Sequence, residues 1–574
     1  MRFEHQPTSF VFSGIELSRC SKQPIRRTPG RCIFTPARLA IGWPYHGSGC
    51  VSEGRRYAEP IISLHDRLKT IVSWGYSVMA LKRCGMAMEI IDRKQEQAKL
   101  HELADEGVPR MALLYGRRRV GKTFLLTHLW SEDRAFYFTA SIVTPEQNRR
   151  QLIRQVSQWS GEHYEPEDYP TWRTVFKLLL SLKSDRPLVV VLDEFQYLGE
   201  NEKDLAQVTS ELNAVWEGPQ RPSRAVLLVL SGSAIRTMEA LDAGGAPLHG
   251  RLSWKAQLEP FDYLDAALMA PFEDLRDRAY TYGVFGGMPR YLASINPSRS
   301  FADNVAELML SPRGDVRGQV ETAILQEQGL RDIPKYLGIL RAIGGGRTEL
   351  SEIAGRAGLA KHTTVREKVE RLVELGYVEQ QRNFDAPRTT PWRYRLADPA
   401  FRFYHEFVTR YETTLEKSDP ADVWKAHVAP EIDRYMGHLF ERIVEQSYDR
   451  KRKTQGLGLV REWGRWEGND RDGKSLEMDI VSRLTSGAML TGAIKWTRRP
   501  IGNELHRNHM RDLQRLADAG NRWAHEALES GSSILYVSAG GFKEGFRERA
   551  EEEGLPVVLW SLEDLYARHG HVRT

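Results

Sequence analysis

The stretch of sequence that decides the fold reads Gly116-Arg117-Arg118-Arg119-Val120-Gly121-Lys122-Thr123. It matches the pattern of a glycine, four free positions and then Gly-Lys-Ser/Thr, which is typical of a phosphate-binding loop. The two glycines allow the backbone to turn tightly enough to direct several N–H groups at one anion. The flanks agree, because residues 111–115 form an apolar run that suits a buried parallel strand and residues 124–130 have the pattern of a helix. The stretch therefore predicts a nucleoside triphosphate site between a strand and a helix.

Each residue of this loop has an expected role in holding phosphate. Lys122 is expected to reach the β- and γ-phosphates, and the Thr123 hydroxyl is expected to coordinate Mg²⁺. The backbone N–H groups of residues 116–121 surround the anion, and the following helix adds the positive end of its dipole. A chance match in a flexible glycine loop is the alternative, and the strand before and helix after it argue against that. We therefore expect all eight residues to bind the nucleotide.

A second motif follows an all-apolar run at residues 188–192. The run predicts a strand buried on both faces, and it ends in Asp193-Glu194-Phe195-Gln196, the pattern of a Walker B motif. Asp193 is expected to hold the Mg²⁺ shell at the carboxyl end of the strand, and Glu194 to orient and deprotonate the attacking water. An exposed acidic turn is the alternative for one such run alone. The phosphate loop about seventy residues earlier favours the catalytic interpretation.

Three further candidates lie near the same edge of the sheet. A third apolar run, residues 226–230, ends in a Ser-Gly-Ser sequence, where a polar side chain can sense the γ-phosphate. Ser231 is the candidate for that role, but a serine of this stretch can equally be an N-cap for the helix that follows, and the sequence leaves both open. Arg251 follows in a loop at the same end, and Pro289 closes a sharp Gly-Gly-Met-Pro turn. Simple loop chemistry is the alternative for these two.

The composition bounds the class of protein. A chain of 574 residues is too long for a single core, so three or four domains are expected. The formal charge of +5 is small for this length, and although the sequence pI is near 8.8, basic runs such as residues 450–453 are usually solvated surface. No apolar stretch approaches the roughly 20 residues that span a bilayer. We therefore expect no membrane partner and a cytoplasmic location.

The first 84 residues differ from the rest of the chain. They contain all four cysteines, and the spacing of these residues matches neither a zinc site nor a disulfide scaffold: Cys20, Cys32, Cys50 and Cys84. The region is rich in Pro, Gly, Ser and Arg and has no periodicity, which predicts either a disordered arm or a later start of translation, at Met86 or Met88. The later start is favoured, because the first regular helical pattern follows those methionines.

The motifs occur in an order that resembles the archaeal and bacterial DEXX-box ATPases, an AAA+-related branch near the STAND signalling ATPases. They are residues 115–123, 192–198, 230–233, 247–251 and 286–289, and the resemblance covers roughly residues 88–500. It implies ATP as the ligand, Arg93 near the adenine, Pro289 at the base end of the nucleotide and Arg251 as an arginine finger. Asp92 stands where the family commonly has a glycine. Because a finger in this loop is better placed at a subunit edge, we expect Arg251 to act on a neighbouring subunit of a homo-oligomer.

Residues 333–398 have the pattern of a winged helix. Three short helices are expected at residues 336–342, 349–357 and 363–375, followed by a two-stranded wing at residues 377–379 and 394–396. If the domain reads DNA, the start of the third helix faces the major groove and the wing meets phosphates, through Lys361, His362, Thr364, Arg366, Arg382 and Arg388. The alternative is a lid or protein-contact module, since acidic residues on the same helix weaken the case for DNA: Glu367, Glu370 and Glu374.

The C-terminal region resembles a PD-(D/E)XK nuclease fold. A helix containing Glu441 precedes strands that carry Asp479 and Lys495, and in such nucleases carboxylates at adjacent strand ends hold Mg²⁺ while a lysine polarises the phosphate. One carboxylate is missing, because Ala493 stands two residues before Lys495. Glu477 shares a strand face with Asp479 and can partly compensate. We therefore expect a decayed nuclease fold that binds nucleic acid or a partner without cutting.

Together these patterns predict an α/β fold: a P-loop NTPase parallel sheet with a helical lid, a winged helix and an α/β nuclease-like C-terminal domain. The expected parts are an N-terminal extension (1–87), the ATPase domain (88–285), the lid (286–332), the winged helix (333–398), a helical linker (399–435) and the nuclease-like domain (436–574). The expected function is ATP binding and hydrolysis, coupled to a module that acts on DNA or a protein partner. The alternatives are a signalling switch that binds ATP without hydrolysis, and a DNA-processing or defence nuclease-ATPase.

Overall fold

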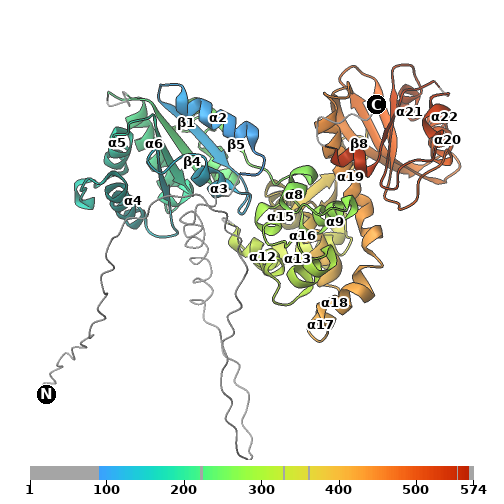
Figure 1. Ribbon diagram of the computed structural model, residues 1–574, viewed down its shortest axis with the longest axis horizontal. Coiled ribbons are helices and arrows are strands. Elements are labelled where there is room, and N and C mark those ends of the chain that lie inside the picture. Colours follow the sequence, from blue (N-terminus) through green and yellow to red (C-terminus); the bar gives the residue numbers. More distant parts are fainter. Residues whose placement is uncertain (1–89, 220–223, 328–329, 360–361, 553, 568–574) are drawn as a thin grey trace, which may run out of the picture. The chain divides into compact units, whose positions relative to one another are not determined.

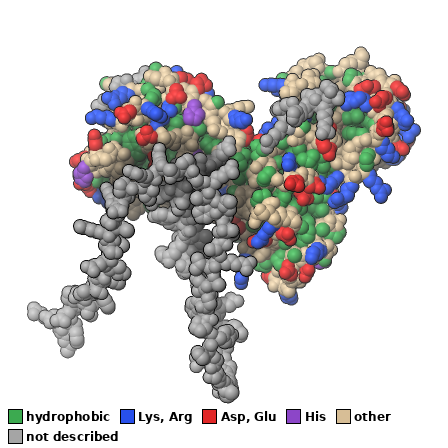
Figure 2. Space-filling view, viewed as in Figure 1, with side chains coloured by type: hydrophobic (Ala, Val, Ile, Leu, Met, Phe, Trp, Pro, Cys, Tyr) green, Lys and Arg blue, Asp and Glu red, His purple; other side chains and the backbone are tan. Residues whose placement is uncertain are grey.

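The computed structural model describes residues 90–219, 224–327, 330–359, 362–552 and 554–567. The expectations for residues 1–87, with all four cysteines, lie outside the described residues, as do Lys361 and the side chain of His362. Among the helices of the described ranges, none is both long and apolar enough to cross a membrane. On the face shown in Figure 2, acidic and basic side chains are interspersed, which agrees with the small net charge of +5.

The first domain is built on a five-stranded, all-parallel sheet with the order β2-β3-β4-β1-β5 (Figure 1). Parallel strands have all their carboxyl ends at one edge, so the loops that follow β1, β3 and β4 lie together there. The apolar runs predicted at residues 111–115, 188–192 and 226–230 form three of these strands. The strands are β1 (Arg110–Tyr115), β2 (Ala135–Thr139), β3 (Leu188–Asp193), β4 (Val226–Gly232) and β5 (Trp254–Gln257).

Helices cover both faces of this sheet, so alternate residues of its strands enter two different cores. Ala112 and Leu114 pack with α2 and α3, whereas Met111 and Leu113 pack with the other helices. Thr144 begins α4 and Thr171 begins α5 with capping boxes. The helices are α2 (Lys94–Asp105), α3 (Lys122–His128), α4 (Pro145–Ser160), α5 (Trp172–Ser181), α6 (Glu202–Trp216) and α7 (Ile235–Ala240).

A helical region follows the sheet. Its longest helix, α9 (Leu275–Phe285), is buried along much of its length and ends at Gly286, from which a short turn leads to Pro289. The other elements are α8 (Tyr263–Met269), α10 (Pro289–Leu292), α11 (Phe301–Val305), the π-helical turn η3 (Ala306–Leu310), α12 (Asp315–Ala323) and the 3₁₀ turn η4 (Ile324–Gln326). This region occupies the place of the predicted lid.

The winged helix is present, with its elements close to the predicted positions. Helix α15 ends at Glu374, and Gly376, with φ +69°, supplies the left-handed residue that lets the chain turn into the wing. The two wing strands are antiparallel and pair from Val378↔Leu396 to Gln381↔Arg393. The elements are α13 (Ile333–Gly344), α14 (Leu350–Arg356), α15 (His362–Glu374), β6 (Val378–Gln381) and β7 (Arg393–Leu396).

Short helices connect the winged helix to the C-terminal domain, as the predicted helical linker requires. The polar stretch at residues 418–422 is not an open linker, because the Asp419 side chain accepts the Ala421 N–H and begins a helix. The elements are α16 (Pro399–Phe403), η5 (Tyr404–Val408), α17 (Glu412–Leu415), α18 (Pro420–Val423) and η6 (Trp424–Val428).

The C-terminal domain has a mixed five-stranded sheet with the order β12-β11-β10-β9-β8. β9 pairs antiparallel with both β8 and β10, whereas β11 pairs parallel with both β10 and β12, so β10 is the strand at which the sheet changes from antiparallel to parallel. The elements are α19 (Ile432–Lys451), β8 (Val460–Asn469), β9 (Ser475–Leu484), β10 (Met489–Lys495), α20 (Glu504–Asp518), α21 (Arg522–Ala527), β11 (Ser533–Ser538), α22 (Phe546–Glu551), β12 (Val557–Trp560) and α23 (Leu562–Tyr566).

Candidate nucleotide site

The phosphate loop runs from the end of β1 to the start of α3, and its shape depends on two glycines. Gly116 has φ +151°, and a Cβ added there would lie 2.4 Å from the backbone oxygen of Leu258. Gly121, with φ +97°, precedes the first residue of α3. Arg119 also has a positive φ, of +71°, which is uncommon for a residue with a side chain. The loop therefore has the tight, left-handed turns that direct backbone N–H groups toward one point.

Lys122 lies across this loop. Its side chain is buried, and its Nζ donates hydrogen bonds to the backbone oxygens of Gly116, at 2.7 Å, and Arg117, at 3.1 Å. Burial lowers the pKa of Lys122, and the nearby carboxylates of Glu194 and Asp193 partly oppose that effect. A buried ammonium that faces several acceptors suits the charge of a polyphosphate.

The predicted metal-binding residues are in direct contact. The Thr123 hydroxyl donates to Oδ2 of Asp193 at 2.8 Å, and the Asp193 side chain is buried at the end of β3. The same oxygen accepts the hydroxyl of Tyr137, and Oδ1 accepts the backbone N–H of Glu194 at 3.0 Å. A hydroxyl and a carboxylate at the phosphate loop are the hard oxygen donors that Mg²⁺ prefers, so these residues fit that ion.

Glu194 is held by two polar side chains. It has a left-handed backbone, with φ +52°, and its Oε2 accepts hydrogen bonds from Ser233 Oγ, at 2.7 Å, and from Gln196 Nε2. Ser231 lies two residues earlier, inside β4, and is fully buried. The alternative that a serine of this stretch caps the next helix is wrong, because α7 has Ala234 at its N-cap without a side-chain hydrogen bond. Ser233 is therefore the strand-end serine that contacts the candidate base.

Three contributors to this network were missed from the sequence. Gln196 stands two residues after Glu194 and Ser233 ends the Ser-Gly-Ser stretch, so both had a weak signal in their motifs. Tyr137 reaches Asp193 from β2, the strand that pairs with β3, and a tyrosine in an apolar strand gives no such signal. Burial and the Asp193 charge raise the pKa of Tyr137, so its hydroxyl remains a proton donor at ordinary pH.

The arginine side chains of the loop reach other elements, although their backbone belongs to the loop. Arg118 donates to the hydroxyl of Tyr197 at 2.5 Å, just beyond the Walker B motif. Arg119 donates to the backbone oxygen of Gln319, at 2.6 Å, and to the side chain of Gln326, at 2.7 Å, on α12 and η4. Arg117 reaches the winged helix. These three arginines are therefore expected to bind phosphate through their backbone N–H groups and not through their side chains.

Arg93 and Pro289, the residues predicted at the base end of the nucleotide, have different surroundings. Arg93, with φ +57°, stacks 4.7 Å over the ring of Phe261 and donates to the backbone oxygen of Glu259. Burial lowers the pKa of Arg93. Pro289 begins α10, and its ring would lie 3.7 Å from a Cβ placed on Gly121. The structure therefore brings Pro289 beside the loop, as the resemblance implies.

Arg251 lies apart from these contacts. Its side chain is 42% exposed, and its Nε pairs with Glu217 at 3.2 Å, at the C-terminal end of α6. An exposed pair of this kind contributes about 0 to 1 kcal/mol, so it does not fix the guanidinium firmly. The action of Arg251 on a neighbouring subunit stays a prediction.

The predicted nuclease residues are in contact but differ from a metal site. Lys495 Nζ lies 2.9 Å from Oδ2 of Asp479, and the same oxygen accepts the backbone N–H of Ile494 at 2.8 Å. Glu441 and Glu477 both pair with Arg465. Within the described ranges, no group of three or more His, Cys, Asp or Glu side chains is arranged to hold a metal ion.

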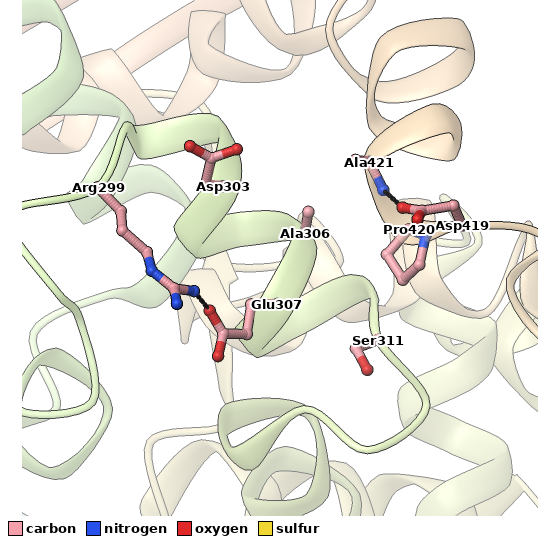
Figure 3. Close-up of a pocket in the computed structure, with 8 residues that line it drawn as sticks. All are labelled: Arg299, Asp303, Ala306, Glu307, Ser311, Asp419, Pro420 and Ala421. Atoms are coloured by element: carbon pink, nitrogen blue, oxygen red, sulfur yellow. Dashed lines mark hydrogen bonds and ion pairs between the residues drawn. The ribbon is translucent and has the colours of Figure 1, made fainter. Parts of the chain in front are cut away.

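A surface groove of about 490 Å³ lies between the α11–η3 segment and the start of α18, shown in Figure 3. Arg299 and Glu307 pair across one side of it, and Asp419 on the other side accepts the N–H of Ala421. Asp303, which also lines the groove, accepts the hydroxyl of Ser300, and the groove includes none of the predicted site residues. We assign it no ligand.

Three family descriptions match successive parts of the chain. Residues 90–295 match the ATPase domain predominantly from Archaea, and residues 334–382 match the IclR helix-turn-helix domain. Residues 404–512 match archaeal and bacterial proteins of unknown function. The first match spans the phosphate loop, the Walker B motif and Pro289.

Three similar proteins, one compared by sequence and two by structure, come from archaea. An uncharacterized protein of Methanocaldococcus jannaschii is 23% identical over 404 residues, which are 68% of this chain and 87% of that protein. Among solved structures, a Walker-type ATPase of Pyrococcus abyssi is 19% identical, with 55% of this chain and 96% of that chain covered and a TM-score of 0.41. The ORC2 protein of Aeropyrum pernix, in ADPNP and ADP complexes, is 17% identical, with coverage of 60% and 96% and a TM-score of 0.37. From its family matches and its site geometry, the chain has a P-loop domain that is similar to the ATPase domain predominantly from Archaea, followed by a winged helix that is similar to the IclR helix-turn-helix domain.

Proposed function

We propose that this chain binds ATP with Mg²⁺ and hydrolyses it to ADP and phosphate. The observation that carries the proposal is the direct contact of Thr123 with Asp193, beside Glu194 at the same strand end. An ion-binding hydroxyl, an ion-binding carboxylate and a second carboxylate for the water are the parts that phosphoryl transfer to water requires. The alternative, a switch that binds ATP without hydrolysis, gives Glu194 no role.

In this mechanism the residues supply position and charge. The loop N–H groups and Lys122 neutralise the β- and γ-phosphates, and Lys122 exchanges its loop carbonyl partners for phosphate oxygens. Thr123 and Asp193 would hold Mg²⁺, which supplies charge neutralisation at the phosphates. Glu194 accepts a proton from the attacking water, and its bonds from Ser233 and Gln196 fix the direction of its carboxylate.

The test is phosphate release by the purified protein at saturating ATP and Mg²⁺. Glu194→Gln keeps the shape of the side chain and removes the base, so we expect a loss of about 10²-fold or more in turnover. Glu200→Gln, a neutralised carboxylate at an exposed position nearby, is the matched control and should turn over like the wild type. Equal turnover in all three proteins would reject Glu194 as the base.

We further propose that the winged helix acts on DNA through α15. The match to an IclR-type helix-turn-helix supports this, and Arg366 is exposed near the start of α15. The wing supports it less, because Arg382 stacks 3.9 Å over Trp392 and neighbouring wing residues contact the C-terminal domain. Turnover with and without duplex DNA separates a DNA-stimulated ATPase from a protein-directed one. Stimulation that Arg366→Ala abolishes is expected, and an unchanged rate favours a protein partner.

We propose that the C-terminal domain binds nucleic acid or a partner and does not cut nucleic acid. The residues do not fit a nuclease metal ion, because Glu441 and Glu477 are paired with Arg465 and Ala493 offers no oxygen donor. Incubation of the protein with supercoiled DNA and Mg²⁺ or Mn²⁺ should leave the DNA intact. Cleavage that disappears in Asp479→Ala would instead establish a nuclease. A cytoplasmic location goes with these proposals, since ATP and DNA are available there together.

A further inference from the structure

Arg117, the first free position of the phosphate loop, has a buried side chain that leaves the nucleotide site. Its Nη1 donates to the backbone oxygen of Gly376 and to Oδ2 of Asp398, both at 3.2 Å. Its guanidinium lies 4.0 Å over the ring of Tyr377. Arg117 is 8% exposed and the Asp398 side chain 4%, so the pair is shielded from water and from salt. A buried charge with a hydrogen-bonded partner and an aromatic face is held firmly in one place.

The three partners of Arg117 form the base of the wing. Gly376 and Tyr377 lead from α15 into β6, and Asp398 follows the end of β7. The N–H of Ala397 donates to the oxygen of Tyr377 at 2.9 Å, which ties the two strand ends together. Arg117 therefore holds both ends of the hairpin at once.

The far end of the wing is fixed to the C-terminal domain. Phe384, at the turn, is 3% exposed and packs in a cluster with Leu476, Met478 and Trp523. Its N–H donates to the oxygen of Arg465 at 2.8 Å, and the Asn383 side chain donates to the oxygen of Glu467 at 2.6 Å, both on β8. The wing is thus an antiparallel hairpin fastened at its base to the phosphate loop and at its tip to β8.

Lys122 adds the link to the nucleotide. Its Nζ donates to the backbone oxygen of Arg117 at 3.1 Å, so a phosphate that draws Lys122 away changes the bonding of the same residue that holds the wing. We propose that Arg117 is a positioning residue that joins the phosphate loop to the wing, and that the wing transmits nucleotide binding to the C-terminal domain. This inference rests on the proposed ATP site and names its route of regulation. This regulation requires two states of the loop. In one, Lys122 donates hydrogen bonds to the backbone oxygens of the loop, and in the other it donates to phosphate oxygens.

The experiment is hydrogen–deuterium exchange of the full chain, read by mass spectrometry with and without saturating AMP-PNP and Mg²⁺. In the wild type we expect the exchange rates of amides in β6, β7 and β8 to change by about 5-fold or more on nucleotide binding. In Arg117→Gln the phosphate-loop peptides should still respond, whereas β6, β7 and β8 should not. Asp398→Asn, which removes the other half of the pair, should give the same uncoupling and serves if Arg117→Gln does not fold.

Arg236→Ala is the matched control. Arg236 pairs with Glu374 and so joins the ATPase domain to the winged helix at an exposed contact outside the proposed route. This variant should keep the wild-type response in β8. A β8 response that persists in Arg117→Gln, or its absence in nucleotide-loaded wild type, overturns the proposal. Failure of the wild type to bind AMP-PNP would overturn the proposed ATP site, and this proposal with it.

Discussion

At the scale of single residues, the nucleotide site depends on contacts that no motif states in full. The sequence correctly indicated that Thr123, Asp193 and Glu194 belong together, because each stands at a fixed place after an apolar strand. It did not indicate Tyr137 or separate Ser233 from Ser231. Those assignments depend on which way a side chain leaves its strand and on the register between strands, which the pattern of apolar residues does not specify.

Gly116 provides a prediction at this scale. Gly116→Ala would place its Cβ 2.4 Å from the Leu258 oxygen, whereas Gly161→Ala, also at positive φ (+73°), meets no atom within 4 Å. Backbone strain costs about 1 kcal/mol at each position, and the clash adds about 1 to 3 kcal/mol at Gly116 only. Thermal unfolding should therefore show a larger fall in Tm for Gly116→Ala, accompanied by weaker ATP binding. Equal Tm values for the two variants would mean that the loop moves freely away from Leu258.

At the scale of elements, apolar runs were enough to place three strands of the parallel sheet, β1, β3 and β4. β5 was missed because its four residues, Trp-Lys-Ala-Gln, alternate between exposed and half-buried and contain no apolar run. It is a strand because it pairs with β1, from Ala112↔Trp254 to Tyr115↔Gln257. A polar edge strand is therefore specified by its neighbour in space more than by its own sequence.

One half-buried histidine, His405, and one buried histidine, His509, predict a pH dependence at this scale. Burial lowers the pKa of His405, in η5, and of His509, in α20, to about 4, and the neighbouring Arg341 and His506 act in the same direction. A histidine with a folded pKa below its ordinary value of 6.5 contributes stability above pH 6.5 that is lost as pH falls toward 4. Each contributes at most about 3 kcal/mol. Tm should fall between pH 6.5 and 4, and less steeply in His405→Gln and His509→Gln. Parallel Tm curves for variants and wild type would contradict this.

At the scale of the whole molecule, a P-loop domain followed by a winged helix was predictable, and the contacts between the domains were not. Each domain type has local patterns, such as the apolar strands or the helix-turn-helix spacing. The Arg117–Asp398 pair joins residues that are 281 positions apart, and Phe384 reads as an ordinary apolar residue in a wing. Such contacts depend on the packing of complete domains, which a single sequence does not specify.

Assembly gives the prediction at this scale. If Arg251 completes the site of a neighbouring subunit, Arg251→Ala and Lys122→Ala proteins should each be inactive alone. Mixed oligomers contain sites with both an intact phosphate loop and an intact neighbouring finger, so part of the turnover should return on mixing. Size-exclusion chromatography with differently tagged variants establishes that mixing occurred. Mixed oligomers without recovered turnover would place Arg251 in its own subunit's site or in a structural role.

The central claim is that the phosphate loop binds ATP and that Glu194 hydrolyses it, and the most direct measurement is the identity of the retained nucleotide. Each protein is incubated with ATP and Mg²⁺, separated from free nucleotide by rapid gel filtration, denatured and analysed by chromatography. Wild type should retain ADP, Glu194→Gln should retain ATP, and Lys122→Ala should retain neither, because it lacks the charge that holds the phosphates. ATP retained unchanged by the wild type, or equal loss of nucleotide from both variants, would contradict the account.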